Sequence, residues 1–113
     1  RVQVENATTP CVVLTTWPES PSPYEAARAL VEARVAACVH VLDAGRSTYR
    51  WNGAVETAHE RQLIIKTTRG ALGALEAQLR TLHPYEVPEW MVLDADAGDA
   101  YGAWLADSVS PPA

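Results

Sequence analysis

Apolar and polar positions along this chain follow two different periods, and the points where the period changes mark the expected strands and helices. The continuous apolar run Cys11–Thr15 is typical of a strand that is buried on both faces. Ser22, Pro23 and Glu25 supply an N-cap, a proline in the first turn and a capping box, so a helix is expected to begin there. This helical pattern ends at 36–38, and its apolar-stripe positions are Ala27, Leu30, Val31, Arg34 and Val35.

A second pattern surrounds the dipeptide Asn52-Gly53, which joins two long runs suited to strands. Asn and Gly tolerate the positive φ of a type I′ turn, so the dipeptide predicts a hairpin with a two-residue loop. The arms extend back to Val39 and forward to Thr68, far beyond a typical strand of about 5 to 6 residues. Such long edges favour cover by a neighbouring subunit, and the alternative is a bent or bulged hairpin that curls over its own core. The expected register places Trp51 opposite Ala54, Arg50 opposite Val55 and Tyr49 opposite Glu56.

The second half of the chain repeats the order of helix and strand. Thr68 is expected to cap a second helix, which ends at His83-Pro84 because proline disfavours helical geometry in the preceding residue. Val87–Leu93 predicts a further strand, and Pro88 within it places that strand at a sheet edge. Asp94–Gly98 is expected to be a loop, followed by a short helix capped by Asp99. The inward positions are Leu72, Leu75, Leu79 and Leu82 on the second helix, and Tyr101, Trp104 and Leu105 on the last.

The order strand, helix, strand, strand, helix, strand predicts an α+β fold of the ferredoxin-like type with a long central hairpin. Right-handed crossovers place both helices on one face of a four-stranded antiparallel sheet and leave the other face bare. We therefore expect that other subunits cover the bare face. The predicted divisions are a flexible arm over residues 1–10, with an edge strand at Val2–Val4, the domain over 11–109, and a tail over 110–113.

Composition narrows the class of protein. The chain has 113 residues, 48% of them hydrophobic and 20% charged, which suits one globular domain without a membrane span. A formal net charge of -5 argues against nucleic-acid binding, which normally needs a basic face. In the predicted topology a third strand separates the strands that begin near Cys11 and Cys38, so we expect free thiols. Free thiols fit a reducing compartment, and the expected location is cytoplasmic.

Five sequence blocks resemble the CutA family of divalent-cation tolerance proteins, in matching order and spacing over about residues 11–109. The resemblance implies a ferredoxin-like subunit, a homotrimer held together by its hairpins, and a shape similar to PII signalling proteins. It also implies a link to copper tolerance and to metal binding. The blocks are V-A-A-C-V at Val35–Val39, Y-R-W-N-G at Tyr49–Gly53, I-I-K-T-T at Ile64–Thr68, L-H-P-Y-E-V-P-E at Leu82–Glu89 and Y-G-A-W-L at Tyr101–Leu105.

The same resemblance implies metal ligands at a cysteine in the first strand and at two adjacent histidines before a Pro-Tyr pair. Here Thr15 occupies the cysteine position, Leu82 occupies one histidine position and His83 remains. One imidazole is a poor site for Cu²⁺ or Zn²⁺, which prefer three or four nitrogen and sulfur ligands. Cys38 offers a thiolate for Cu(I), although a lone cysteine at a strand start is more often a buried small apolar residue. His83 and Cys38 are thus the candidate ligands for copper or another divalent cation.

A second candidate site is a polar cluster at the ends of the hairpin and after the second helix. One interpretation is a set of salt bridges and hydrogen bonds between subunits. The other is a pocket between subunits, in which two aromatic rings stack on a small molecule and Lys66 binds an anionic group. Glu60 and Lys66 are six residues apart, which places them on one face of a regular strand. The members of the cluster are Arg50, Trp51, Glu60, Lys66, Tyr85 and Glu89.

Catalytic motifs are missing from the sequence, which has no phosphate-binding Gly-rich loop, no H-E-x-x-H and no nucleophile elbow. We therefore expect a protein that is not an enzyme. The sequence favours a homotrimer with a role in metal-ion tolerance, binding metal weakly. The alternative is a PII-like small-molecule sensor or scaffold that binds no metal.

Overall fold

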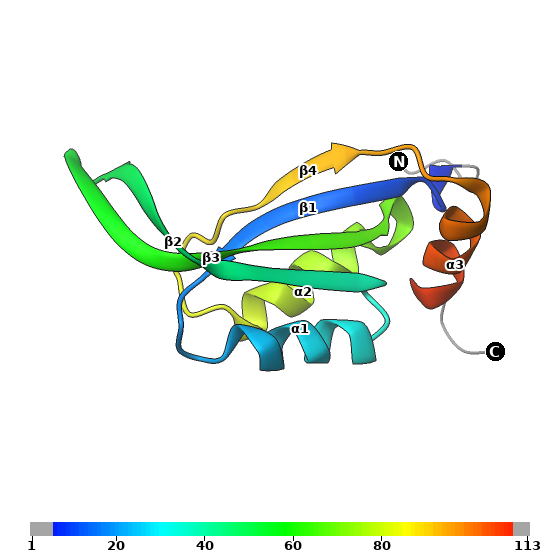
Figure 1. Ribbon diagram of the computed structural model, residues 1–113, viewed down its shortest axis with the longest axis horizontal. Helices are drawn as coiled ribbons and strands as arrows, with labels where there is room; N and C mark the ends of the chain where they lie inside the picture. Colours follow the sequence, from blue (N-terminus) through cyan, green and yellow to red (C-terminus); the bar gives the residue numbers. More distant parts are fainter. Residues whose placement is uncertain (1–5, 110–113) are drawn as a thin grey trace.

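The computed structural model describes residues 6–109 (Figure 1). The edge strand expected at Val2–Val4 and the tail expected at 110–113 lie outside the described residues. Ala7 and Thr9, in the expected flexible arm, accept backbone hydrogen bonds from Gly70 and Arg69, so this part of the arm packs on the domain. The elements are β1 (Pro10–Trp17), α1 (Pro23–Glu32), β2 (Cys38–Trp51), β3 (Ala54–Thr68), a 3-10 turn (Arg69–Ala71), α2 (Leu72–Leu82), β4 (Met91–Asp94) and α3 (Asp99–Val109).

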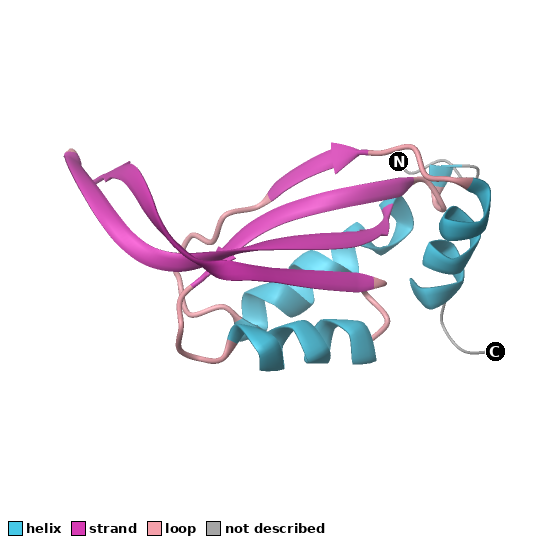
Figure 2. Cartoon of the chain, viewed as in Figure 1, coloured by secondary structure: helices cyan, strands magenta, loops and turns pink. Residues whose placement is uncertain are grey.

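The four strands form one antiparallel sheet in the order β2-β3-β1-β4, which confirms the predicted α+β architecture. Helices α1 and α2 cover one face of this sheet, and α3 lies at the end where β1 begins (Figure 2). Strand β3 separates the strands of the two cysteines, as expected, and both are free thiols. The core between sheet and helices is built from alternate apolar side chains of β1 and β3 and from the buried faces of α1 and α2, chiefly Val13, Trp17, Leu63 and Ile65 on the strands and Leu30, Leu75 and Leu79 on the helices.

The β2–β3 hairpin has the predicted register at its tip, where Trp51 lies opposite Ala54 and Tyr49 lies opposite Glu56. Asn52 and Gly53 both have positive φ, as the two-residue turn requires. The inner part of β3 is also paired with β1, but that pairing ends at Arg61. Beyond Arg61 the hairpin projects from the body and gives the subunit extents of 45 × 26 × 24 Å (Figure 1). A bulge is present in β2, but the outer arms remain exposed and do not curl over the core.

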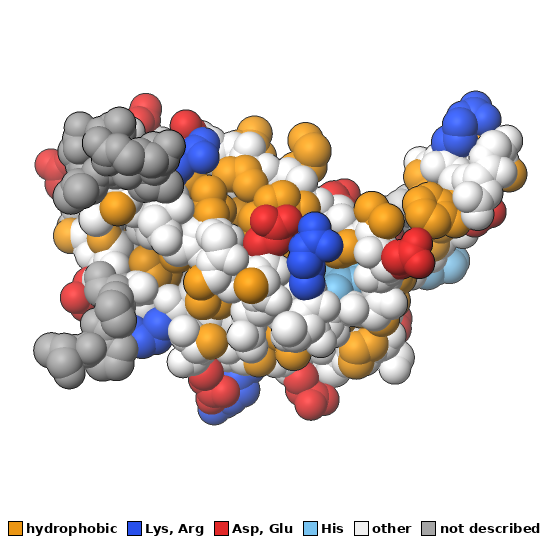
Figure 3. Space-filling model, turned by 180° about the vertical axis from the view of Figure 1, so that it is seen from behind, with side chains coloured by type: hydrophobic (Ala, Val, Ile, Leu, Met, Phe, Trp, Pro, Cys, Tyr) orange, Lys and Arg blue, Asp and Glu red, His pale blue; other side chains and the backbone are white. Residues whose placement is uncertain are grey.

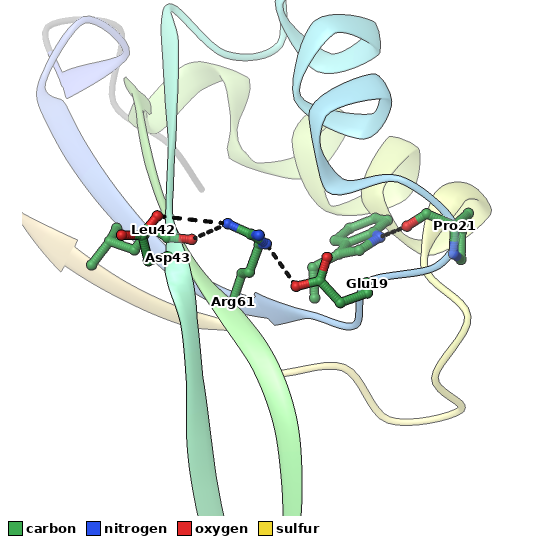
Figure 4. A network of polar contacts seen from close by, with 6 residues as sticks. Glu19, Pro21, Leu42, Asp43 and Arg61 are labelled. Atoms are coloured by element: carbon green, nitrogen blue, oxygen red, sulfur yellow. Dashed lines mark hydrogen bonds and ion pairs between the residues drawn. The ribbon is translucent and has the colours of Figure 1, made fainter.

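Arg61 lies where the hairpin leaves the body. Its side chain is bonded to the Glu19 carboxylate at 2.9 Å and to the Leu42 carbonyl oxygen at 3.1 Å (Figure 4). Leu42 belongs to the bulged part of β2, and Glu19 to the loop between β1 and α1. The guanidinium also lies 5.4 Å from the centroid of the Tyr24 ring. Arg61 therefore ties the bulge to the body of the subunit.

Helix α1 begins as predicted, since the Ser22 hydroxyl accepts a hydrogen bond from the backbone N–H of Glu25. It ends at Glu32, earlier than predicted, because Arg34 adopts a φ of 60°. The backbone N–H of Val35 donates to the Leu30 carbonyl oxygen, and that of Arg34 to Val31, which is a Schellman termination without glycine. The buried stripe runs through Ala26 and Leu30, and Val31 is exposed, contrary to the prediction.

Three further predictions about the second half were wrong. Thr68 makes no side-chain capping bond, and a 3-10 turn separates it from α2. The end of α2 is as expected, since its last residue is Leu82 and His83 is the C-cap. Strand β4 is only Met91–Asp94 and includes Asp94, because the segment around Pro88 stays irregular. Asp99 is the first residue of α3, and the Gly98 carbonyl oxygen accepts from the Gly102 N–H.

The buried faces of α2 and α3 also differ from each other. Leu75 and Leu79 are buried, with Leu72 and Leu82 packed against the core, which confirms the predicted face of α2. On α3 only Leu105 is buried among the described residues, whereas Tyr101 and Trp104 are exposed on the single subunit.

Candidate functional site

A groove of about 810 Å³ lies between the outer hairpin and the segment that follows α2. We call it the acidic groove. One wall comes from both arms of the hairpin, and the other from residues 84–89, which leave the helix at His83. The lining residues are Thr16, Ser47, Thr48, Tyr49, Trp51, Glu56, Glu60, Pro84, Tyr85, Glu86, Val87, Pro88 and Glu89.

His83 lies behind the groove and is buried between two aromatic rings. The ring centroids of Trp17 and Tyr85 are 4.3 Å and 4.7 Å from that of His83. Its Nε2 is 2.7 Å from the carbonyl oxygen of Thr16, and its Nδ1 accepts the backbone N–H of Tyr85 at 3.1 Å. These partners fix the neutral tautomer that carries its proton on Nε2. Burial lowers the pKa of His83, against smaller opposing effects of the Thr16 bond and the Glu60 charge.

Glu60 and Glu89 enter the groove from opposite walls, and each is held by a polar neighbour. The Tyr85 hydroxyl donates to Glu60 Oε2 at 3.0 Å. Burial, together with the bond to Glu60 and its negative charge, raises the pKa of Tyr85 to about 12. The Gln62 side-chain amide donates to Glu89 Oε2 and to the Thr15 carbonyl oxygen, both at 2.8 Å. Sheet, hairpin and 84–89 segment are thus joined by hydrogen bonds around these two carboxylates.

The groove has a one-sided charge. Four glutamates line it, and its lining contains no lysine, arginine or histidine. Carboxylates, hydroxyls and aromatic faces all attract positive charge, so the site suits a cationic group and repels an anionic one.

The structure brings together four members of the predicted polar cluster: Trp51, Glu60, Tyr85 and Glu89. It separates the other two. Lys66 lies on the same face of β3 as Glu60, but six positions at about 3.3 Å each place them roughly 20 Å apart. Lys66 instead lies 5.7 Å from the Tyr101 ring centroid, and Arg50 is exposed on the hairpin outside the groove lining. Within one subunit Lys66 therefore does not reach this groove, and binding of an anionic group by Lys66 in a pocket between subunits stays a prediction.

The two candidate metal ligands are also far apart. Cys38 pairs with Lys66 in the sheet, whereas His83 contacts Thr16, which pairs with Gln62. Both ring nitrogens of His83 are already bonded, so a metal ion would have to displace one of these partners. Within residues 6–109 no group of three or more His, Cys, Asp or Glu is arranged to hold a metal ion.

Thr15 and Leu82, at the positions where the resemblance implied metal ligands, are both part of the packing. Leu82 packs against the core, and the Thr15 side chain is fully buried opposite Leu63. The Thr15 hydroxyl is the one buried side-chain polar atom in the described residues without a hydrogen-bond partner.

Several lining residues were not predicted. Glu56 and Glu86 were not named as site residues, and Gln62 joins the site only through its bond to Glu89. The alternation of β3 was the available signal, since Gln62 lies two residues from Glu60 and so on the same face. Tyr85 and Glu89 were predicted to share a cluster with Trp51 and Glu60, but the sequence did not indicate that the 84–89 segment would reach the hairpin of its own subunit.

The fold and the groove together define a class of protein: a small α+β subunit with a split βαβ core, an elongated hairpin and an acidic groove at the hairpin base. The family model described as CutA1 divalent ion tolerance protein matches residues 11–108. The chain belongs to this family.

Individual relatives agree with this membership. The divalent-cation tolerance protein CutA of Thermus thermophilus is 41% identical over 98 residues, covering 86% of this chain and 95% of its own length. The CutA protein of Pectobacterium atrosepticum is 39% identical over 99 residues, covering 87% of this chain and 90% of its own length. The crystal structure of CutA from Xylella fastidiosa matches with a TM-score of 0.85 at 37% identity, covering 90% of this chain and 99% of that one.

His83 predicts a pH dependence of stability. Its pKa is lowered in the folded state from an ordinary value near 6.5, so the unfolded chain binds the extra proton first. The free energy of unfolding is therefore expected to fall as the pH drops below 6.5, with a slope of up to about 1.4 kcal/mol per pH unit until the lowered pKa is reached. Urea unfolding of wild type and His83→Gln between pH 7 and pH 5 measures this slope. A His59→Gln control removes an exposed histidine and should keep it, and an equal slope in His83→Gln would contradict the assignment.

Thr15 predicts a stabilising substitution. Replacing it by valine removes a buried unpaired hydroxyl while keeping the side-chain shape, so Thr15→Val is expected to raise the free energy of unfolding by about 1 kcal/mol. Thr67→Val is the matched control, because Thr67 is equally buried but donates a 2.9 Å hydrogen bond to the Val35 carbonyl oxygen. That change should cost about 1 kcal/mol. Denaturant midpoints at one protein concentration would show opposite signs, and a destabilised Thr15→Val protein would mean that its hydroxyl has a partner.

Proposed function

We propose that this protein acts in tolerance to divalent cations, copper among them, as a cytoplasmic homotrimer with weak direct metal binding. One observation carries the proposal: beyond Arg61 strand β3 is paired with β2 alone, and no helix in residues 6–109 covers this part of the hairpin. Tyr49, Trp51 and Val55 are exposed there, and they supply apolar area for contact with another subunit. Figure 3 shows how far this arm stands from the body, with basic side chains at its tip.

The sheet face opposite α1 and α2 supports the same assembly. Because Leu63 and Ile65 point into the core, the alternate residue Ile64 points away from it, as do Leu14 and Met91 paired beside it. Met91 and Leu93 are exposed on the short edge strand β4. A threefold assembly would cover both this face and the arms of the hairpin. The proposed cellular role in cation tolerance is supported by membership of the CutA1 family.

Direct contact with metal is proposed for Cys38, with His83 as the less favourable ligand. Cys38 and His40 alternate with the core-facing Val39, so thiol and imidazole lie on the same, outward face of β2. A thiol with an imidazole is a suitable ligand pair for soft copper, although two donors bind it only weakly. No helix in the described part of the chain is long and apolar enough to cross a membrane.

A second candidate function is that of a small-molecule sensor or scaffold without metal. The observation in its favour is the acidic groove, which has the volume of a small-ligand site and no chelating trio. Neither candidate assigns catalysis to the protein.

The trimer proposal predicts that an exposed hairpin valine contributes to association. Val55→Ser should weaken the trimer, since Val55 is 64% exposed on the single subunit and each trimer contains three copies. Val31→Ser is the matched control, because Val31 is 40% exposed on α1, away from the hairpin. Sedimentation equilibrium of dilute protein measures the association constants. A monomeric wild type, or equal effects of the two changes, would overturn the proposal.

The metal proposal is tested by titrating copper into metal-free protein. We expect weak binding that Cys38→Ser reduces and that His83→Gln leaves unchanged, because the His83 nitrogens are already engaged. Isothermal titration calorimetry with Cu²⁺, and with Cu(I) under reducing conditions, gives affinity and stoichiometry. Tight binding that is lost in His83→Gln would reverse the assignment of the ligands, and no saturable binding at all would favour the second candidate.

A further inference from the structure

The inward-facing row of β3 side chains changes character where the hairpin leaves the body. Ile65 and Leu63 are fully buried in the core, and Arg61 is the next residue in the same row. The Arg61 side chain is 17% exposed, and it lies toward the start of α1 and outside the lining of the acidic groove. The core of the subunit therefore ends at a guanidinium group instead of an apolar side chain.

The part of β2 opposite Arg61 contains the bulge. Two residues of β2, Leu42 and Asp43, stand opposite Gln62 alone. A bulge of this kind interrupts the ladder of backbone hydrogen bonds and bends the strand. The Arg61 side chain donates to the Leu42 carbonyl oxygen at 3.1 Å and lies 4.0 Å from the Asp43 carboxylate. Arg61 thus binds the part of β2 at which the hairpin bends.

The other partners of Arg61 belong to the body of the subunit. Its Nε donates to Glu19 Oε1 at 2.9 Å, in the loop before α1 (Figure 4). The ring of Tyr24, in the first turn of α1, has its centroid 5.4 Å from the guanidinium carbon, within the range of a cation–π contact. A planar guanidinium with five donors serves several partners in different directions at once. We call Arg61 with Glu19, Tyr24 and Leu42 the Arg61 latch.

The position of the hairpin tip is sensitive to the angle at this bend. The seven steps of β3 from Arg61 back to Ala54, at about 3.3 Å each, span roughly 23 Å. A rotation of about 10° at the bulge would therefore move the tip by about 4 Å, which is the whole reach of an apolar contact. A two-stranded ribbon is marginally stable by itself, so the outer arms do little to fix their own direction.

We propose that Arg61 is a positioning residue for assembly, which holds the hairpin in the direction that lets its exposed apolar residues meet a neighbouring subunit. This inference rests on the homotrimer proposed above and adds the residue that controls its formation. The control passes through Glu19, which lies in a loop of the body and outside the hairpin. Subunit association is thereby linked to the start of α1.

A purely structural role would use the same contacts. Arg61 would then stabilise the folded subunit, and its loss would affect assembly only by lowering the fraction of folded chains. The geometry favours positioning, because the bonds of Arg61 to Leu42 and Glu19 join the two parts that would move relative to each other if the hairpin turned.

Sedimentation equilibrium of Arg61→Met and Glu19→Ala tests the proposal. Methionine keeps most of the side-chain length and removes every donor. A partly exposed ion pair contributes about two- to fivefold per subunit, so three copies should weaken the overall trimer association constant roughly ten- to hundredfold. The matched controls are Arg80→Met and Glu76→Ala, which break an exposed 3.2 Å ion pair on α2 and should leave the constant unchanged.

Double-mutant cycles separate positioning from stability. Val55→Ser should weaken association less in the Arg61→Met background than in the wild type, because a misdirected valine no longer makes its contact. Arg61→Met and Glu19→Ala together should weaken association no more than Arg61→Met alone, since both break one latch. Additive effects in either cycle, or an unchanged association constant in Glu19→Ala, would overturn the proposal.

Failure of the latch is distinguishable from failure of the trimer. A monomeric wild type would refute the homotrimer and this inference with it. A trimeric wild type whose association constant is unchanged in Arg61→Met would refute the latch alone. If Arg61→Met fails to fold, as judged by thermal unfolding, Glu19→Ala and its cycle with Val55→Ser carry the test, because the Glu19 side chain is 55% exposed in a loop.

Discussion

The inner part of β3 is hydrogen-bonded on both sides, whereas from Glu60 to the turn it is paired with β2 alone. The rest of the structure depends on this loss of one neighbour. Up to Arg61 the sheet has helices beneath it, and its side chains alternate between buried and outward positions. Past Arg61 the same alternation has no core to face, so apolar and polar residues are exposed alike. An unpaired edge with apolar side chains is stabilised by contact with another chain, so strand length is the physical ground for the homotrimer proposed above.

The same transition makes the groove. Arg61 ties the β2 bulge to the loop before α1, and the hairpin therefore leaves the body at a fixed place. On the other side, His83 ends α2 and its ring accepts the N–H of Tyr85, which directs the chain toward Glu60. One wall of the acidic groove thus follows from strand pairing and the other from helix termination. A neutral imidazole suits this position, because a charged one would lose the bond from the Tyr85 N–H.

Elements governed by local backbone rules were predictable from the sequence. The Asn52-Gly53 turn fixed the hairpin register, and His83-Pro84 ended α2 where expected. Predictions failed where tertiary packing outweighed a local preference. Arg34 adopts a left-handed conformation that a Schellman ending usually assigns to glycine, and so α1 stops early. Tyr101 and Trp104 follow an inward helical pattern, but α3 lies at the end of the sheet, where the described residues leave both rings partly exposed.

The candidate site was predictable in its residue types and not in its distances. Strand alternation correctly placed Glu60 and Lys66 on one face, but the prediction left out the rise of about 3.3 Å per residue, which sets them roughly 20 Å apart along the strand. Removing Lys66 from the cluster changes the sign of the site, because the residues that remain are acidic and aromatic. The roles of the residues at the implied metal-ligand positions were likewise not predictable from residue type alone. Thr15 and Leu82 serve the core, and His83 uses both nitrogens to shape the backbone. Around His83, where the resemblance implied a set of metal ligands, this chain has packed and hydrogen-bonded side chains, and the carboxylate of Glu60 lies beside them, bonded to Tyr85.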